Sequence, residues 1–279
     1  MTQATLRDAV RFSGVGLHTG ADASVEIRPA PTDHGVQFVI DGVRVPATGE
    51  HVVETARATV LGIGTHMVST VEHVLSALFG MEIANAEIAV SGPEIPIVDG
   101  SAKAFADAFA QAGIEKQSRP TIDFEPLEPF EMRDGDRALI VLPGDGLRVR
   151  FVADFPPPVG VQYFDGWIDA ATYRSEIAPA RTFGYLDEVT ALRARGLARG
   201  GSLDNAIVFS PNGAMQELRW SNEVVRHKVL DLLGDLSLLG MRPRCDIVAI
   251  KSGHDLHVRA VRELRERSLS RTHEVPSPT

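Results

Sequence analysis

The feature that most constrains the fold of this 279-residue chain is an irregular alternation of short β-rich runs and helical patterns. The β-rich runs are bounded by Gly, Pro or Asp and lie at residues 24–28, 36–40, 86–90, 138–142, 147–152, 206–209 and 246–250. Helical apolar periodicity lies at residues 70–79, 101–112, 186–195, 222–239 and 257–266. Because helices and strands do not alternate one for one, a doubly wound parallel sheet is disfavoured and an α+β fold is predicted.

A polar segment near the middle of the chain divides it. Residues 115–120 read Glu-Lys-Gln-Ser-Arg-Pro and are predicted to link an N-terminal domain at residues 1–118 to a C-terminal domain at residues 121–268. Residues 269–279 are polar, contain two prolines and are predicted to form a flexible tail. No repeat of fixed period is visible, although a duplicated fold whose halves have diverged would leave none.

Composition excludes several classes of function. The net charge is −9 at neutral pH, which argues against a nucleic-acid binder because no basic surplus exists to neutralise phosphates. The single cysteine, Cys245, excludes an internal disulfide and a cysteine-based zinc cluster, so any metal must be held by His, Asp or Glu. The N-terminus lacks a signal-peptide pattern and no apolar stretch is long enough to span a bilayer, so we expect no integral membrane segment and a cytoplasmic location.

The segment Ser-Thr-Val-Glu-His at residues 69–73 opens a helical pattern. One interpretation is a capping box, in which Ser69 and Glu72 satisfy the first backbone N–H groups of the helix and nothing more. The other is chemical: a carboxylate next to an imidazole places a general base, Glu72, beside a metal ligand, His73.

His227 and Asp231 lie four residues apart on a second helical pattern, so they share one face and can bind one metal ion. Asp235 continues that face by a further turn. A simple His–Asp pair on a helix needs no metal. However, the residues flanking these polar groups are largely Val and Leu, and polar groups on a buried helix require partners that a metal site would supply.

Three further segments carry side chains that could face a ligand. In Lys-Ser-Gly-His, His254 follows a strand-like run and could be an acid or oxyanion stabiliser, or simply a surface-loop histidine. In Gly-Val-Gly-Leu-His-Thr-Gly, His18 lies in a predicted tight turn whose glycine spacing does not fit a dinucleotide-binding loop. Thr182 and Phe183, after Pro179, are either a ligand contact or a loop anchor.

Taken together, two His, one Asp and a nearby Glu are the ligand set of a zinc hydrolase with one position left open for water.

The sequence as a whole also resembles one family, that of the UDP-3-O-acyl-N-acetylglucosamine deacetylases, zinc amidases of lipid A synthesis. The resemblance covers about residues 5–264 and rests on six motifs in order: SGVGLHTG at 13–20, STVEH at 69–73, PEIPIVDGSA at 93–102, ARTFG at 180–184, RHKVLDLLGDL at 226–236 and KSGH at 251–254.

The resemblance implies a role for each matching residue of the metal site. His73, His227 and Asp231 would bind zinc, one ion per chain, and Glu72 would be the general base that activates the attacking water. An acetamide is a poor electrophile, so its hydrolysis needs a strong nucleophile at neutral pH and a stabilised oxyanion.

The resemblance also implies roles around that centre. His254 would be the cationic acid that protonates the departing amine, with Asp235 orienting it, and Thr182 would donate a hydrogen bond to the oxyanion. Phe183 would pack on the sugar and Lys228 would meet the diphosphate or neighbouring hydroxyls. His18 is expected to be a further substrate contact.

The fold implied by the resemblance is two similar two-layer α/β domains packed with their helices sandwiched between the sheets. An insert near residues 185–209 would form an apolar passage for the acyl chain. The sequence therefore predicts a monomeric enzyme that releases acetate from UDP-3-O-(3-hydroxyacyl)-N-acetylglucosamine. The alternatives are a zinc amidase for another N-acetylated sugar nucleotide and a catalytically inactive homologue that binds the lipid precursor.

Overall fold

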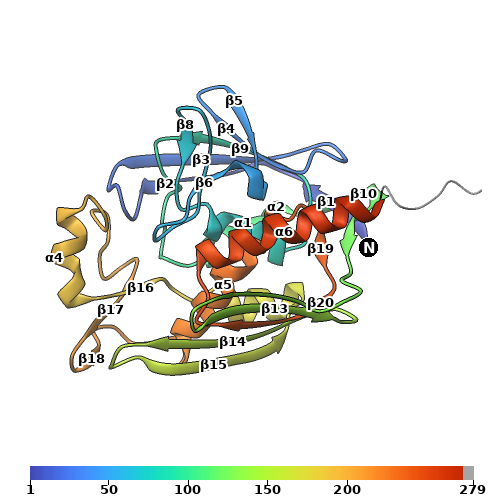
Figure 1. Ribbon diagram of the computed structural model, residues 1–279. Coiled ribbons are helices and arrows are strands. Elements are labelled where there is room, and N and C mark those ends of the chain that lie inside the picture. Colours follow the sequence, from blue (N-terminus) through green and yellow to red (C-terminus); the bar gives the residue numbers. More distant parts are fainter. Residues whose placement is uncertain (273–279) are drawn as a thin grey trace, which may run out of the picture.

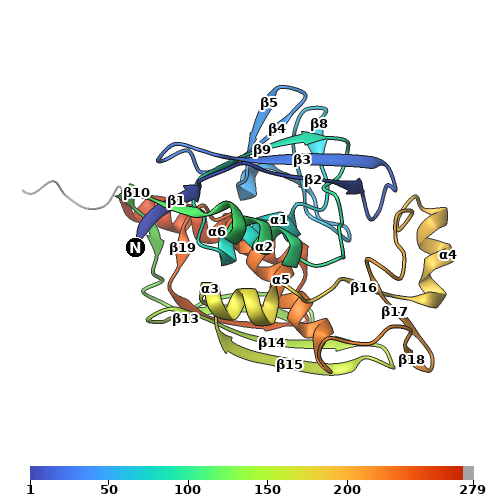
Figure 2. The same ribbon diagram turned by 180° about the vertical axis from the view of Figure 1, so that it is seen from behind.

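Two five-stranded sheets form the outer layers of the molecule, and helices fill the space between them (Figures 1 and 2). The computed structural model describes residues 1–272. The first sheet has the order β2-β3-β9-β4-β5 and consists of β2 (Val10–Val15), β3 (Asp22–Pro29), β4 (Val36–Ile40), β5 (Val43–Pro46) and β9 (Ala86–Ser91). The second has the order β12-β13-β20-β14-β15 and consists of β12 (Phe130–Asp134), β13 (Arg137–Pro143), β14 (Leu147–Phe155), β15 (Gly160–Trp167) and β20 (Cys245–Ile250).

The two sheets have the same topology. In each, two antiparallel hairpins flank a strand that arrives later in the chain. That strand runs antiparallel to one hairpin and parallel to the other: β9 pairs with β3 and β4, and β20 pairs with β13 and β14. The mixed pairing excludes a doubly wound parallel sheet, and the predicted α+β fold of two similar layered halves is confirmed. The residue boundaries proposed for the two domains stay a prediction.

The middle layer is built from helices of both halves. The first half supplies α1 (Glu72–Gly80) and α2 (Lys103–Ala112). The second supplies α3 (Ala170–Thr172), the π-helical turn η2 (Tyr173–Ile177), α5 (Glu223–Ser237) and α6 (His254–Thr272). Most residues of α5 are buried, as expected of a helix covered on nearly all sides. The apolar core runs from one sheet through these helices to the other.

α1 and α5 touch closely because α5 carries a glycine at the contact. A Cβ atom at Gly234 would lie 2.2 Å from the carbonyl oxygen of Glu72, so no larger residue fits without moving one helix. This contact brings the first turn of α1 against the middle of α5. In chain order, α1 comes after β5 and α5 comes after β15, and each of these strands is the fourth of its own sheet. The two halves therefore meet through equivalent elements.

Each half carries an insert between that fourth strand and its long helix. The first insert contains the 3₁₀ turn η1 (Gly49–His51) and the small sheet β6 (Val52–Glu54), β7 (Val60–Ile63) and β8 (His66–Val68). The second contains β16 (Phe183–Tyr185), α4 (Leu186–Ala194), β17 (Ile207–Ser210) and β18 (Gly213–Ala214). α4 stands apart from the layered body, at the left of Figure 1.

The polar segment predicted to link the two domains forms a paired strand. β10 (Ile114–Pro120) runs antiparallel to the N-terminal strand β1 (Thr2–Leu6). It reads as polar because most of its residues are exposed, while its backbone is held by β1. A short parallel pair, β11 (Asp123–Phe124) with β19 (Arg242–Pro243), follows it.

The C-terminal helix differs from its predicted range at both ends. α6 begins at His254 rather than residue 257 and continues to Thr272, beyond the predicted start of a flexible tail. The rest of that predicted tail, residues 273–279, lies outside the described residues. Within residues 1–272, none of the helices combines the length and the apolar character needed to cross a membrane.

Candidate active site and metal centre

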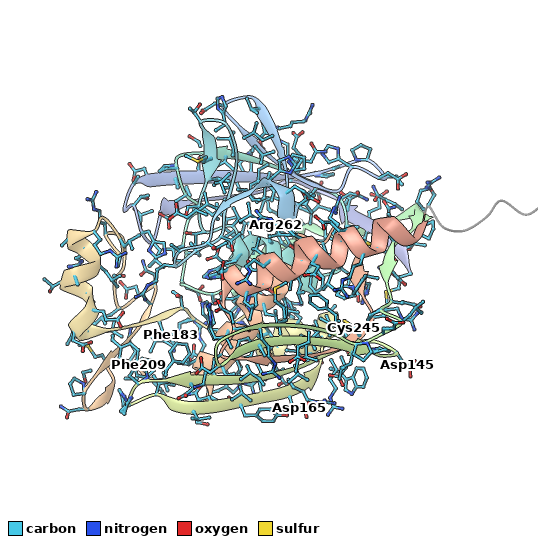
Figure 3. The ribbon with its side chains drawn as sticks, viewed as in Figure 1. Asp145, Asp165, Phe183, Phe209, Cys245 and Arg262 are labelled. Carbon is cyan, nitrogen blue, oxygen red and sulfur yellow. The ribbon has the colours of Figure 1, made fainter. Side chains whose placement is uncertain are left out.

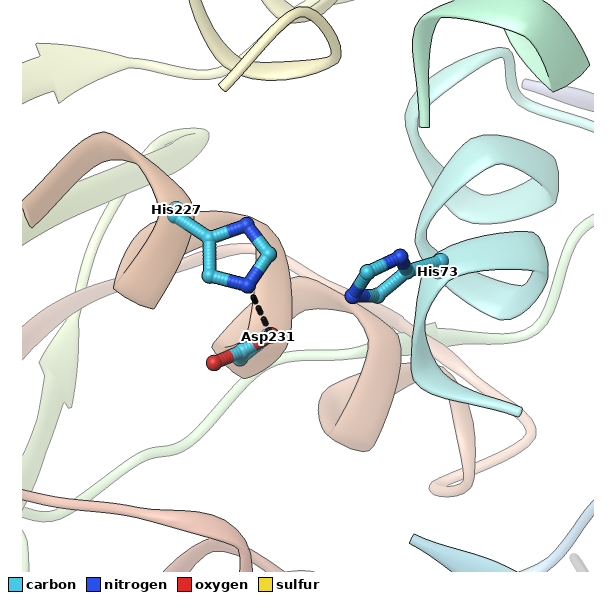
Figure 4. A group of neighbouring side chains, drawn as sticks. All are labelled: His73, His227 and Asp231. Atoms are coloured by element: carbon cyan, nitrogen blue, oxygen red, sulfur yellow. Dashed lines mark ion pairs between the residues drawn. The ribbon is translucent and has the colours of Figure 1, made fainter. Parts of the chain in front are cut away.

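Three buried side chains from the two central helices converge on one point (Figure 4). His73 comes from the first turn of α1, and His227 and Asp231 come from successive turns of α5. Each offers a ligand atom, and these atoms lie within 4.8 Å of one another. His227 Nε2 is 3.4 Å from Asp231 Oδ1, and the two imidazole rings meet edge to face with centroids 5.1 Å apart.

Neighbouring groups fix the protonation of these side chains. The carbonyl oxygen of Ala180 lies 3.1 Å from His227 Nδ1 and can only accept, so Nδ1 carries the proton and Nε2 is left as a lone pair facing Asp231. Burial lowers the pKa of His227 and keeps the ring neutral. Burial opposes the charge of Asp231, but Lys228 Nζ, 2.6 Å from its Oδ2, helps to hold the pKa of that carboxyl well below its usual range.

The same residues fit a zinc ion. Burial lowers the pKa of His73 to about 3, so its ring is neutral, and the nitrogen farther from Cβ faces His227 and Asp231 (Figure 4). A neutral imidazole has the nitrogen lone pair that metal binding requires. Two neutral imidazoles and one carboxylate are also the donor set of catalytic zinc sites, which leave a further position open.

A carboxylate and an imidazole flank the three ligands. Glu72 Oε2 accepts a hydrogen bond from the backbone N–H of Thr59 at 3.0 Å, and Oε1 is 4.0 Å from His254 Nε2. Burial raises the pKa of Glu72 to about 7. Burial lowers the pKa of His254, but Asp235 outweighs it and raises that pKa to about 9, so His254 is a cation at neutral pH.

The capping-box interpretation of Glu72 is wrong. α1 begins at Glu72 rather than at residue 70, and no side chain caps its first turn. Thr70 has a φ of +59°, a left-handed conformation that ends any helical continuity with Ser69. The Glu72 carboxylate is therefore directed at Thr59 and the site, not at the start of its own helix.

Asp235 is the centre of a buried hydrogen-bond cluster. Its Oδ1 accepts from the Thr59 hydroxyl at 2.6 Å, and its Oδ2 accepts from Nδ1 of His254 and from Nδ1 of His257, each at 2.8 Å. Burial opposes its charge, but these donors lower the pKa of Asp235 to about 2. Asp235, His254 and His257 also have the spacing of a metal site. Their mutual hydrogen bonds account for that spacing.

Sequence reasoning missed Thr59 and His257. Thr59 follows β6 in the first insert and has no motif of its own, so its contact with Asp235 across 176 residues left no local signal. His257 had one: it lies three residues after His254, which places both rings on one face of α6.

A pocket of about 570 Å³ joins the ligand cluster to α4. Its wall includes all three ligand residues together with Glu72 and His254, and also four predicted contacts, His18, Thr182, Phe183 and Lys228. Asp235 lies behind His254 and does not line the pocket. Apolar side chains of the second insert line the part of the pocket near α4: Leu186, Val189, Leu192, Leu203 and Val208.

Phe183 connects the ligand cluster to the second insert. Its ring is edge to face with His227, with centroids 6.3 Å apart, and also meets Phe155 at 4.9 Å and Phe209 at 6.4 Å. Figure 3 labels Phe183 and Phe209, which lie on the side of the molecule from which α4 projects. The preceding Thr182 is held by its backbone N–H, which donates to the Gly100 carbonyl at 2.7 Å.

A further buried carboxylate, Glu94, holds the loop that carries His18. It accepts hydrogen bonds from the backbone N–H groups of His18 and Thr19 and from the hydroxyls of Thr19 and Thr70. A Cβ at Gly16 would lie 2.2 Å from its Oε2, which explains the glycine in that turn. Glu94 thus links the His18 loop to Thr70, two residues before Glu72.

Buried His, His and Asp side chains spaced as in a metal site, a carboxylate of raised pKa and a cationic imidazole in one pocket are the groups of a metal-dependent hydrolase. The family model of LpxC, UDP-3-O-acyl N-acetylglycosamine deacetylase, matches residues 3–266, and the chain belongs to this family. It is therefore a zinc-dependent deacetylase of lipid A biosynthesis, and the function predicted from the sequence motifs is confirmed.

Individual relatives agree. The UDP-3-O-acyl-N-acetylglucosamine deacetylase of Anaeromyxobacter sp. (strain Fw109-5) is 44% identical over 268 residues, covering 94% of this chain and 88% of that protein. The protein of the same name from Nostoc sp. (strain PCC 7120 / SAG 25.82 / UTEX 2576) is 40% identical over 275 residues, covering 95% of this chain and 98% of the relative.

Proposed function

We propose that His73, His227 and Asp231 hold one zinc ion per chain and that the substrate is UDP-3-O-(3-hydroxyacyl)-N-acetylglucosamine. Zinc bound there supplies a Lewis acid that polarises the amide carbonyl and acidifies water. The observation that carries the proposal is the convergence of the three buried ligands with Glu72 and His254 in one pocket.

Glu72 takes the proton of the attacking water. Its carboxylate is desolvated and accepts a single backbone N–H bond, so it stays basic enough to receive a proton near neutral pH. The water oxygen then forms the new bond to the amide carbon. Thr182, in the pocket wall, would donate a hydrogen bond to the oxyanion that develops.

His254 supplies the proton for the leaving amine. The C–N bond breaks as the nitrogen receives that proton, and the products are acetate and the free amino sugar. The imidazolium is supported from behind by Asp235, which binds Nδ1 and leaves Nε2 facing Glu72. The pKa of the acid, about 9, therefore lies above that of the base, about 7, so near neutral pH His254 holds its proton while Glu72 can accept one.

The remaining contacts belong to substrate binding. Phe183 would pack on the sugar, His18 would contact the substrate from the opposite loop, and Lys228 would meet the diphosphate. The Lys228 ammonium also binds Asp231 Oδ2, so its donors would be divided between the ligand carboxylate and the substrate. The cytoplasmic location and the monomeric state stay predictions from the sequence.

The apolar wall formed by α4 and its neighbours would take the acyl chain, and acetate release from substrates with and without that chain tests this. Each buried methylene contributes about 0.8 kcal/mol, so we expect loss of the chain to lower kcat/KM by at least about 100-fold. Leu192→Asp should impair the acylated substrate and leave the rate on UDP-N-acetylglucosamine unchanged.

Two outcomes would contradict this proposal. Equal kcat/KM with and without the acyl chain would favour an amidase for another N-acetylated sugar nucleotide. Binding of the acylated substrate without acetate release would favour an inactive precursor-binding homologue.

A further inference from the structure

His257 is a fully buried histidine with both ring nitrogens engaged. Its Nδ1 lies 2.8 Å from Asp235 Oδ2, and its Nε2 lies 2.8 Å from the hydroxyl of Ser252, which is also buried. It is not among the residues that line the active-site pocket. Nothing in the proposed mechanism uses it, although it touches the carboxylate that orients His254.

The geometry fixes which atoms donate. The Asp235 carboxylate is ionised and can only accept, so Nδ1 of His254 and Nδ1 of His257 both carry protons. Burial keeps His257 neutral, which leaves its Nε2 as an acceptor for the Ser252 hydroxyl. A single carboxylate oxygen therefore binds one cationic and one neutral imidazole.

These contacts hold Asp235 from every side. α5 carries the carboxylate, α6 carries both histidines, and the first insert supplies Thr59, whose hydroxyl binds the other oxygen. Loss of the His257 donor would leave Oδ2 with His254 alone, so that Thr59 at Oδ1 would be the other remaining side-chain contact that restrains rotation of the carboxylate. His254 would then lose the fixed direction in which its Nε2 faces Glu72.

We propose that His257 is a positioning residue for His254, acting through Asp235, and that Ser252 fixes the tautomer in which His257 donates from Nδ1. This inference rests on the proposed role of His254 as the acid. It adds a residue from outside the pocket to the machinery of the leaving-group step.

Three substitutions at His257 separate the loss of its hydrogen bond to Asp235 from the loss of its side-chain volume. His257→Asn places an amide N–H close to where Nδ1 stands and can still donate to Asp235. His257→Leu has nearly the shape of Asn without its polar atoms. His257→Gln places its amide near the position of Nε2, within reach of Ser252 but not of Asp235.

The readouts are kcat, KM and zinc content of the zinc-loaded full chain with the acylated substrate. We expect His257→Asn to keep kcat within about 3-fold, and Leu and Gln to lower kcat about 10-fold or more with KM and zinc content unchanged. If the Leu variant does not fold, the Asn and Gln variants, both polar, make the same comparison.

Equal kcat values for the Asn and Gln variants would overturn the inference. His254→Gln, measured in parallel, separates this failure from that of the underlying mechanism. It is expected to lose about 100-fold or more in kcat. A fully active His254→Gln would overturn both the acid role and the inference, whereas an impaired one beside equal His257 variants would overturn the inference alone.

Discussion

Glu72 and Asp235 are both buried carboxylates near His254, yet they differ in pKa by several units. Asp235 accepts three hydrogen bonds from side chains, one of them from an imidazolium, and its pKa falls to about 2. Glu72 accepts one backbone N–H and keeps a longer separation from the same imidazole, so burial dominates and its pKa rises to about 7. The close charge of His254, together with the hydrogen bonds from His254 and His257, lowers the pKa of Asp235 against burial, whereas burial dominates at Glu72.

Glu72→Gln tests the base directly. The amide cannot accept a proton, but it keeps the size of the side chain and lies outside the ligand set, so zinc should stay bound. We expect kcat for acetate release to fall by about 100-fold to 10,000-fold with zinc content unchanged, measured by metal analysis of the same sample. Glu115→Gln, on the exposed strand β10, is the control and should retain wild-type turnover.

His254 gives the pH dependence its upper limit. Asp235 raises the pKa of His254 to about 9, so the protonated acid and hence kcat should be lost as pH rises through that value. In Asp235→Asn the raising charge is gone while burial still lowers the pKa. The basic limb of the pH–rate profile should therefore move down by at least about one pH unit.

The control for that shift is Asp246→Asn, which removes an acid paired with Arg150 on the second sheet. It should leave the basic limb in place. A limb that stays near pH 9 in Asp235→Asn would show that another group carries the proton.

At the scale of elements, the site depends on how closely two equivalent helices approach. The first turn of α1 carries Glu72 and His73, the middle of α5 carries the other two proposed ligands, and Gly234 lies at the contact. The ligand set is thus divided between the two halves of the molecule. Neither half alone contains all three ligands.

Gly234→Ala should therefore disturb the metal centre without touching a ligand. Its Cβ would lie 2.2 Å from backbone, which cannot be relieved by a side-chain rotation, so the helices must move apart. We expect a loss of about 1–3 kcal/mol in the free energy of unfolding and a weaker affinity for zinc, measured by denaturant titration and competitive chelation. Gly14→Ala, whose Cβ meets only Pro96 Cβ at 3.7 Å, should change neither quantity.

Helices and strands were predicted well from the sequence where the spacing of apolar residues matches the buried face of the element. The His227–Asp231 spacing on an apolar helix pointed to two candidate ligands, and the structure brings both beside His73, because polar groups on a helix covered on nearly all sides need partners. The prediction missed the strand β10, because the exposed polar residues of the predicted linker carry no sign that its backbone is paired. It also failed at Ser69, because capping-box spacing carries no information about the left-handed conformation of Thr70.

At the scale of the whole molecule, the site forms where two topologically equivalent halves meet. Local motifs identified Glu72, His73 and His254 as candidates but not their mutual contacts, since Glu72 and His254 lie in different halves of the chain. Thr59 shows the limit most clearly: it binds Asp235 and Glu72 from a loop with no distinguishing pattern. Such contacts form only when distant segments pack together, so no short stretch of the sequence indicates them.

The central claim is that zinc held by His73, His227 and Asp231 is required for amide hydrolysis. Acetate release from the acylated substrate should be measured on the purified chain, after removal of metal by a chelator, and after addition of zinc. We expect turnover to disappear with the metal and to return with about one zinc per chain. Full turnover in the chelated, metal-free protein would contradict the claim.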